Sequence, residues 1–151
     1  MKKLMFMCLM ALACVGFTAC GSDDDDNGGG GGNNNGFTKY EKAEVTETSN
    51  QLILTYSESV GDLFINVKWT CDFKDNECTS SKMEFTYPSE KLAQEEYQDL
   101  VDAKDEDDTN LYSIKGNVVT IDNSAEFKGY NKEVMKYVME ATAEEFNKKN
   151  K

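Results

Sequence analysis

Alternation of apolar and polar residues is the clearest pattern in the chain, and it runs from Glu41 to Tyr87. Six successive odd positions are apolar, namely Leu63, Ile65, Val67, Trp69, Cys71 and Phe73. Shorter sets repeat the alternation on either side: Leu52, Leu54 and Tyr56 before it, and Met83, Phe85 and Tyr87 after it. Because successive side chains of a strand point to opposite sides, the pattern predicts three or four antiparallel strands with one buried face.

Helical spacing replaces the alternation after Tyr87. Pro88, Ser89 and Glu90 end the strand and suit the first turn of a helix. The apolar stripe of this helix is Leu92, Ala93, Tyr97, Leu100 and Val101. Asn131 can cap a final helix, and the stripe of that helix is Val134, Met135, Val138, Met139, Thr142 and Phe146. Both stripes predict helices that bury one side.

A second hairpin is expected between the two helices, because Gly116-Asn117 is a typical two-residue turn. Across this turn Tyr112 and Ile114 face Val119 and Ile121. The predicted order of elements is therefore β-β-β-α-β-β-α. We expect an α+β fold in which an antiparallel sheet of about five strands carries two helices on one face.

The first twenty residues have the pattern of a secretory signal. Lys2 and Lys3 precede an almost wholly apolar run from residue 4 to residue 17, and small residues follow up to Cys20. A spanning helix needs roughly 20 apolar residues, so the shorter run makes a retained membrane helix the weaker interpretation. We expect residues 1–19 to be a signal peptide.

Two short motifs at the end of this signal resemble those of known lipoproteins. Phe17-Thr18-Ala19-Cys20 resembles the lipobox of bacterial lipoproteins, in which the signal is cut before a cysteine that carries the lipid. The acidic run that follows resembles the export signal of surface lipoproteins of Bacteroidetes, and it consists of Ser22, Asp23, Asp24, Asp25 and Asp26. The resemblance implies a lipid on Cys20 and a domain on the outer face of the outer membrane. A domain that faces the periplasm is the alternative.

Residues 20–36 are expected to tether a single domain at 37–151. The stretch from Asn27 to Gly36 reads NGGGGGNNNG and has no apolar side chain to bury, so it cannot offset the entropy cost of ordering. The protein would then contact the membrane through the lipid on Cys20.

Composition excludes several classes of function. The chain has no histidine and no arginine, and its 28 acidic residues outweigh 16 basic ones to a net charge of −12. Without histidine there is no Ser-His-Asp or Cys-His activation and no imidazole-ligated metal. The negative charge opposes binding to nucleic acid. No cofactor is expected, apart from a weakly bound Ca²⁺.

Cys71 and Cys78 are the two cysteines of the predicted domain. In an oxidising compartment they are expected to form a disulfide across the hairpin. Pairing Cys71 directly opposite Cys78, however, would turn Met83 and Phe85 away from the buried face. We therefore predict a β-bulge between Cys78 and Met83.

A cluster of acids follows the first predicted helix, and Asp102, Asp105, Asp107 and Asp108 could form a weak Ca²⁺ site. A solvated loop is the favoured interpretation, because the glycine of an EF-hand loop is missing. Trp69 is expected in the core. Tyr40, Tyr130 and Tyr137 are better candidates for an exposed aromatic patch.

These features favour a non-catalytic binding or interaction module whose ligand is a glycan, a protein or a neighbouring surface complex. An acidic inhibitor of a cationic enzyme is one alternative. A hydrolase that uses only carboxylates is another, and it requires two converging acids, one of them with a raised pKa.

Replacement of Asp23 to Asp26 by alanine tests the predicted location. On intact cells we expect an added protease to cleave the native protein and to leave this variant intact, because the variant would stay on the periplasmic side. Immunoblotting of both strains measures the outcome. Protection of the native protein as well would place the domain in the periplasm and contradict surface display.

Overall fold

The structure is a computed structural model that describes residues 37–60 and 63–149. The predicted signal peptide, Cys20, the acidic run Ser22 to Asp26 and the tether lie outside the described residues, so they remain predictions. The segment Asn34–Lys151 forms a compact unit of its own. Within its described part, the core residues of the sheet and the helices pack on one another, so we expect this segment to fold by itself.

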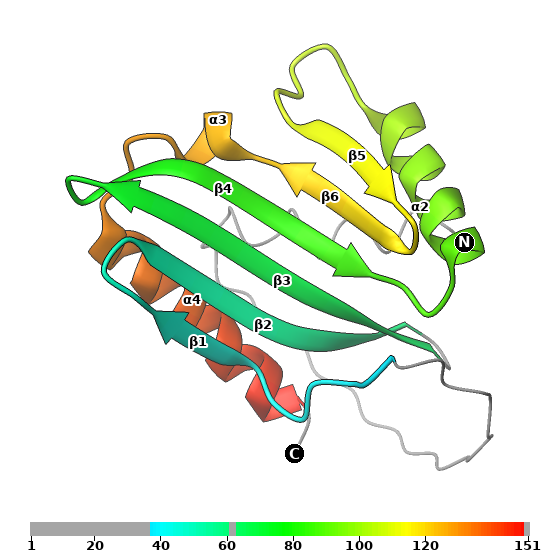
Figure 1. Cartoon of the computed structure of the whole chain (residues 1–151), viewed down its shortest axis with the longest axis horizontal. Helices are drawn as coiled ribbons and strands as arrows, with labels where there is room; N and C mark the ends of the chain where they lie inside the picture. Colours follow the sequence, from blue (N-terminus) through cyan, green and yellow to red (C-terminus); the bar gives the residue numbers. More distant parts are fainter. Residues whose placement is uncertain (1–36, 61–62, 150–151) are drawn as a thin grey trace, which may run out of the picture. The chain divides into compact units, whose positions relative to one another are not determined.

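Six strands form one antiparallel sheet (Figure 1). Their bounds are β1 Glu44–Glu47, β2 Gln51–Val60, β3 Leu63–Lys74, β4 Glu77–Thr86, β5 Leu111–Lys115 and β6 Val118–Asp122. The order across the sheet is β1-β2-β3-β4-β6-β5. The first four strands are joined in sequence, whereas the chain crosses to the far edge to form β5 and returns as β6 beside β4.

Three helices complete the described domain: α2 Glu90–Ala103, α3 Ser124–Phe127 and α4 Lys132–Lys149. The α+β fold class is confirmed, but the predicted element order lacked β1 and α3. Strand β1 is four residues long and directs only Val45 toward the core, so it carries too little alternation to be recognised. Helix α3 is a single turn without an apolar stripe.

One face of the sheet is buried beneath the helices. Cross-strand partners share a face, and one such row is Leu54, Trp69, Met83, Ile121 and Tyr112. Helix α4 packs over β1 and β2, while α2 packs over β5 and β6. The side chains between sheet and helices form the core, and they include Leu52, Leu54, Val67, Val119, Met135 and Met139. The prediction of two helices on one face is confirmed.

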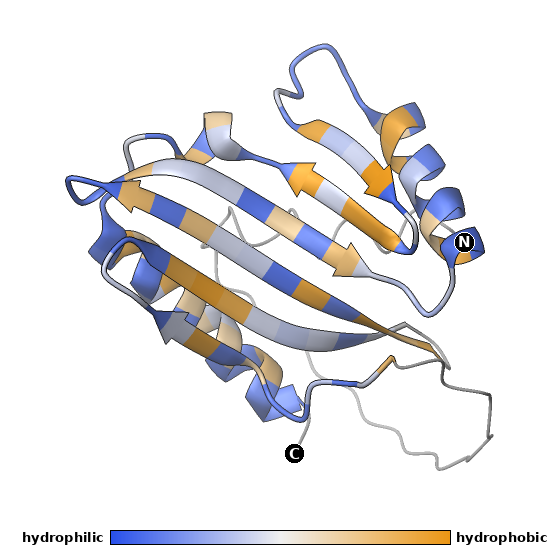
Figure 2. Cartoon of the chain, viewed as in Figure 1, coloured by the Kyte–Doolittle hydropathy of each residue, from blue (hydrophilic) through white to orange (hydrophobic). Residues whose placement is uncertain are grey.

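The opposite face of the sheet is largely polar. Along the central strands, hydrophobic residues alternate with hydrophilic ones (Figure 2). Lys68 and Glu84 form an ion pair on this face with 3.5 Å between Nζ and Oε2. The alternation seen in the sequence therefore reports which face of the sheet meets the helices.

The predicted helix starts and turns are confirmed. The Ser89 hydroxyl accepts a hydrogen bond from the Leu92 amide at 3.3 Å. Asn131 Oδ1 accepts one from the Glu133 amide at 2.8 Å. Gly116 has a φ of 59°, which suits the hairpin turn between β5 and β6.

The predicted bulge is also confirmed, and it lies at Thr79. Phe73 pairs with Cys78, but Asp72 pairs with Ser80, so Thr79 is the extra residue in β4. Beyond the bulge Met83 and Phe85 regain the buried side, opposite Trp69 and Val67. An extra residue in one strand shifts the phase of all later side chains, which is why both halves of β4 can face the core.

Candidate functional site

A pocket of about 460 Å³ lies at one end of the sheet, which we call the turn end. Three segments form this end: the β1–β2 turn, the β3–β4 turn and the first turns of α4. The pocket is lined by Glu47, Ser49, Asn50, Phe73, Asp75, Asn76, Lys132, Glu133 and Lys136. Most of these side chains are polar or charged, so the pocket suits a ligand that forms hydrogen bonds.

Backbone hydrogen bonds hold the three segments together. The Lys132 amide donates to the Asn76 carbonyl at 3.0 Å, and the Phe73 amide donates to the Asn50 carbonyl at 2.8 Å. Asp75 and Asn76 have φ values of 51° and 69°. Such left-handed values are tolerated best by Gly, Asn and Asp, so this residue pair favours the tight β3–β4 turn.

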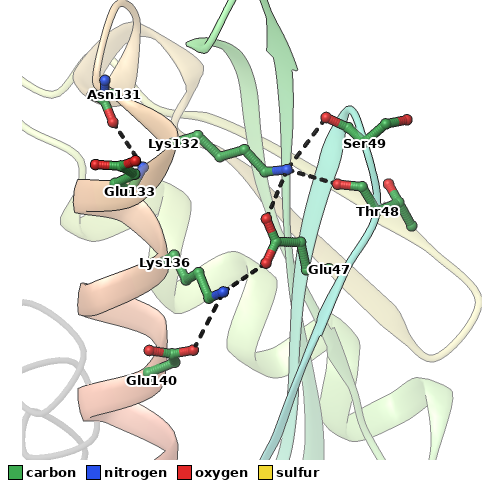
Figure 3. A network of polar contacts seen from close by, with 8 residues as sticks. All are labelled: Glu47, Thr48, Ser49, Asn131, Lys132, Glu133, Lys136 and Glu140. Atoms are coloured by element: carbon green, nitrogen blue, oxygen red, sulfur yellow. Dashed lines mark hydrogen bonds and ion pairs between the residues drawn. The ribbon is translucent and has the colours of Figure 1, made fainter.

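A lysine–glutamate network crosses the wall of the pocket (Figure 3). Lys132 Nζ lies 2.9 Å from Glu47 Oε1 and donates to the carbonyls of Thr48 at 2.7 Å and Ser49 at 3.3 Å. An ammonium group has three N–H donors, so these three acceptors satisfy it. Lys132 therefore ties α4 to the β1–β2 turn and has no donor left for a ligand.

Lys136 is the more accessible cation of the network. Its Nζ lies 2.7 Å from Glu47 Oε2 and 4.0 Å from Glu140, and 41% of its side chain is exposed. One carboxylate, Glu47, thus serves two ammonium groups, and hydrogen bonds from Lys136 and Lys132 lower its pKa. Glu133 and Lys136 present charge of both signs to the pocket.

Three exposed side chains lie in the first turns of α4 and just before the helix. They are Tyr130, Val134 and Tyr137, which we call the tyrosine strip. Their exposed fractions are 48%, 49% and 74%. Val134 and Tyr137 are three residues apart and lie on one side of α4, whereas Tyr130 precedes the helix by two residues. The prediction that Tyr130 and Tyr137 are exposed is confirmed, whereas the expected inward position of Val134 is wrong.

The tyrosine strip is supported from the core. The Tyr130 ring contacts the edge of Phe127 at 5.7 Å between centroids, and Phe127 packs on Trp69 at 5.5 Å. The Tyr130 carbonyl also accepts a hydrogen bond from the Cys78 amide at 2.8 Å. Tyr130 is therefore held in place before any ligand arrives, which lowers the entropy cost of binding.

The described chain begins at the opposite end of the sheet. Phe37 stacks on Phe64 at 5.1 Å, and Asn66 donates to the Thr38 carbonyl at 2.8 Å. Both partners lie near the β2–β3 hairpin. From Phe64 to Phe73, β3 spans about 30 Å at the usual rise of a strand. The turn end is thus separated from the point at which the chain enters the domain by the length of the sheet.

The predicted disulfide between Cys71 and Cys78 is absent from the structure, which has both residues as buried free thiols. The two-residue turn pairs Phe73 with Cys78, and the bulge then places Ser81 opposite Cys71. Cys71 Sγ donates to Ser81 Oγ at 3.5 Å, and Cys78 Sγ donates to the Ser80 carbonyl at 3.4 Å. Burial raises the pKa of Cys71 to about 12 and also raises the pKa of Cys78.

The predicted acidic cluster is an exposed helix end and loop. Gln98 donates to Asp102 at 2.9 Å, and the Asp107 amide donates to Asp105 Oδ1 at 3.2 Å. Asp108 accepts hydrogen bonds from the Asn110 amide and the Tyr112 hydroxyl. Within residues 37–60 and 63–149, no three of the ligand-type side chains come together as a metal site. The weak Ca²⁺ site remains an untested prediction.

The structure also bears on the predicted core position of Trp69 and on the hypothesis of a hydrolase that uses only carboxylates. Trp69 is 6% exposed and donates to Ser81 Oγ at 2.9 Å, so its predicted core position is confirmed. Burial raises the pKa of Glu58, as a general acid requires. Burial raises the pKa of Tyr87, and the negative charges of Glu96 and Glu58 raise it further. Glu58 pairs with Ile65 near the β2–β3 hairpin, so it does not line the turn-end pocket.

Comparisons of the chain with protein-family models, curated proteins and solved structures found no match. In the part of the chain that the structure describes, the helices are too short or too polar to cross a membrane.

Glu47→Gln tests the lysine–glutamate network through its pH dependence. The lowered pKa of Glu47 means that its stabilisation is present above the unfolded-state pKa of about 4.3 and is lost as the pH falls through the folded-state pKa. Between pH 5 and 3, the free energy of unfolding should therefore decrease less in this variant than in the native chain. Urea unfolding followed by Trp69 fluorescence measures this, with Glu44→Gln as the control; equal slopes would show that the network is not stabilising.

Thiol titration tests the state of the two cysteines. In the folded segment 34–151, freed of reductant, neither thiol should react at pH 8, because burial and the raised pKa values keep the thiolate fraction small. After unfolding in guanidinium chloride, both should react with a chromogenic disulfide. If no thiol appears after unfolding, the isolated protein carries the disulfide instead.

Proposed function

We propose that the protein is a surface-anchored lipoprotein whose domain is a non-catalytic binding module, with its binding site at the turn end. The main support is the position of the pocket and the tyrosine strip. Both lie at the end of the sheet that is remote from residue 37, where the tether would join the domain. A lipid on Cys20 would then leave the turn end clear of the point at which the tether joins the domain.

The chemistry of the turn end favours a neutral carbohydrate. Tyr130 and Tyr137 offer flat ring faces for the C–H side of a sugar ring. The pocket at the same end of the sheet supplies hydrogen-bonding groups for hydroxyls, among them Glu133, Lys136 and Asn76. The net charge of −12 disfavours an anionic glycan.

A flat protein partner fits the turn end less well. The tyrosine strip consists of only three residues, and charged residues of α4 lie near it, including Glu133, Lys136 and Glu140. Typical protein interfaces bury about 800 Å² on each partner around an apolar centre. A narrow strip at the same end of the sheet as a polar pocket is more suitable for an extended chain of sugars than for such an interface.

A hydrolase that uses only carboxylates is the second candidate. The raised pKa of the half-buried Glu58 favours it, because a general acid needs a pKa above the ordinary value of a carboxyl. The catalytic site of such a hydrolase would lie near the β2–β3 hairpin, and the tyrosine strip would then have no role.

Alanine substitutions in the strip test the proposed function. We expect the segment 34–151 to be retarded in native gels that contain a neutral polysaccharide, with dextran, mannan, xylan and laminarin as probes. Tyr137→Ala and Tyr130→Ala should each weaken binding about tenfold or more, equivalent to ~1.4 kcal/mol, because each removes one stacking surface. Isothermal titration with the retarding glycan measures the affinity.

Tyr40→Ala is the matched control, since Tyr40 is 40% exposed but its backbone is bound to Ser57 at the other end of the domain. This control should bind like the native segment. Polygalacturonate, an acidic glycan, should not bind. The carbohydrate proposal fails if no neutral glycan binds, or if Tyr137→Ala binds as well as Tyr40→Ala. Release of reducing sugar would favour the hydrolase, and Glu58→Gln should then abolish that release.

A further inference from the structure

The lysines of the turn-end pocket are already occupied by partners within the domain. Lys132 uses its three N–H groups on Glu47 and two backbone carbonyls. Lys136 is bound to Glu47 and lies 4.0 Å from Glu140. These two lysines and two glutamates balance each other in charge. They leave a ligand at most one free N–H donor, on Lys136.

Two carboxylates of the pocket lie outside this balance. Asp75 and Glu133 line the pocket, but none of the ion pairs among the described residues includes either of them. Glu133 bonds to Asn131 through its backbone amide alone. Lys74, the lysine nearest in sequence to Asp75, does not line the pocket and has Glu77 as its cross-strand neighbour. Asp75 and Glu133 therefore present uncompensated negative charge to a ligand.

The neutral polar side chains of the pocket are also available. Ser49, Asn50 and Asn76 are bound within the domain only through their carbonyls, which accept from Lys132 and from the Phe73 amide. Their side chains can both donate and accept. The pocket thus offers an excess of acceptors and two negative charges. An ammonium group suits it, because it has three donors and forms charge-assisted hydrogen bonds with carboxylates.

We propose that the turn-end pocket binds the protonated amino group of an amino sugar. The ammonium would donate to Asp75 and Glu133, and the ring hydroxyls would bond to the neutral side chains. The inference rests on the proposed function, because it names the sugar unit that a carbohydrate-binding domain would hold in this pocket. The net charge of −12 favours such a cationic unit. Ca²⁺ is less suitable, since it takes about six to eight oxygen ligands.

Methyl glycosides of glucosamine and galactosamine are the probes, and the same glycosides with an N-acetylated amine are the matched controls. Added at pH 6, where the amine is protonated, to the isotope-labelled segment 34–151, the amines should shift the amide signals of residues 49–50, 75–76 and 132–136. They should bind about fivefold more tightly than the N-acetyl forms. This preference should vanish at pH 9, where the amine is neutral, and it should decrease in high salt.

A double variant tests the two carboxylates. Asp75→Asn and Glu133→Gln together remove both charges and keep the shapes of the side chains, and asparagine tolerates the φ of 51° at position 75. This variant should bind the amine and N-acetyl forms equally. The control variant Asp99→Asn with Glu106→Gln removes the same charges at residues that do not line the pocket, so it should keep the preference. The amide spectrum of each free variant verifies its fold.

Several outcomes would overturn the inference. These are equal binding of the amine and N-acetyl forms by the native segment, no shift of the pocket amides, and an unchanged preference in the double variant. Tighter binding of N-acetyl-lysine methylamide than of either amino sugar would assign the pocket to a protein side chain instead. Displacement of the amines by Ca²⁺ would assign it to a cation.

The proposed function is judged by a separate readout, the retardation by a neutral polysaccharide that depends on Tyr137. If this retardation is observed and the amine preference is absent, only the inference about the pocket fails. If no polysaccharide retards the segment, the proposed function fails, whether or not the amines shift the pocket amides.

Discussion

Burial of one face of the antiparallel sheet is the constraint on which the rest of the structure depends. The row from Leu54 through Trp69 to Ile121 places large apolar side chains on one side of adjacent strands, and helices α2 and α4 cover them. Once that face is committed to the core, the polar residues between these positions must face solvent. The outward sides of the helices, the strand edges and the turns are then the surfaces left for binding.

The bulge at Thr79 reconciles this constraint with the tight turn before it. A two-residue turn at Asp75-Asn76 pairs Phe73 with Cys78, whereas burial of Met83 and Phe85 requires the opposite phase. The extra residue satisfies both, at the cost of one irregular pair. It also places Ser81 opposite Cys71, where its hydroxyl accepts from the Trp69 indole, and it leaves the β3–β4 turn where α4 can bind it.

The local pattern was sufficient to predict most elements and part of the candidate site. Alternation and turn residues predicted the long strands, both main helices, the hairpin at Gly116 and the bulge, because these depend on neighbours in the sequence. Tyr130 and Tyr137 were recognised as exposed since they fall outside the apolar stripe. The role of Glu47 was missed, because its partners Lys132 and Lys136 are more than 80 residues away. Val134 was placed in the core, since helical spacing alone does not say how wide the covered side of α4 is.

The sequence by itself determined the fold class, the face of each strand that is buried and the absence of histidine and arginine chemistry, because periodicity and composition are properties of the chain alone. Only the tertiary structure decided that β6 returns between β4 and β5, which leaves β5 as an open edge. It alone decided that the pocket and the tyrosine strip share one end of the sheet, and that Cys71 faces Ser81. Each of these outcomes depends on strand order and register, and they are set by long-range packing between segments that carry no local signal of their partners.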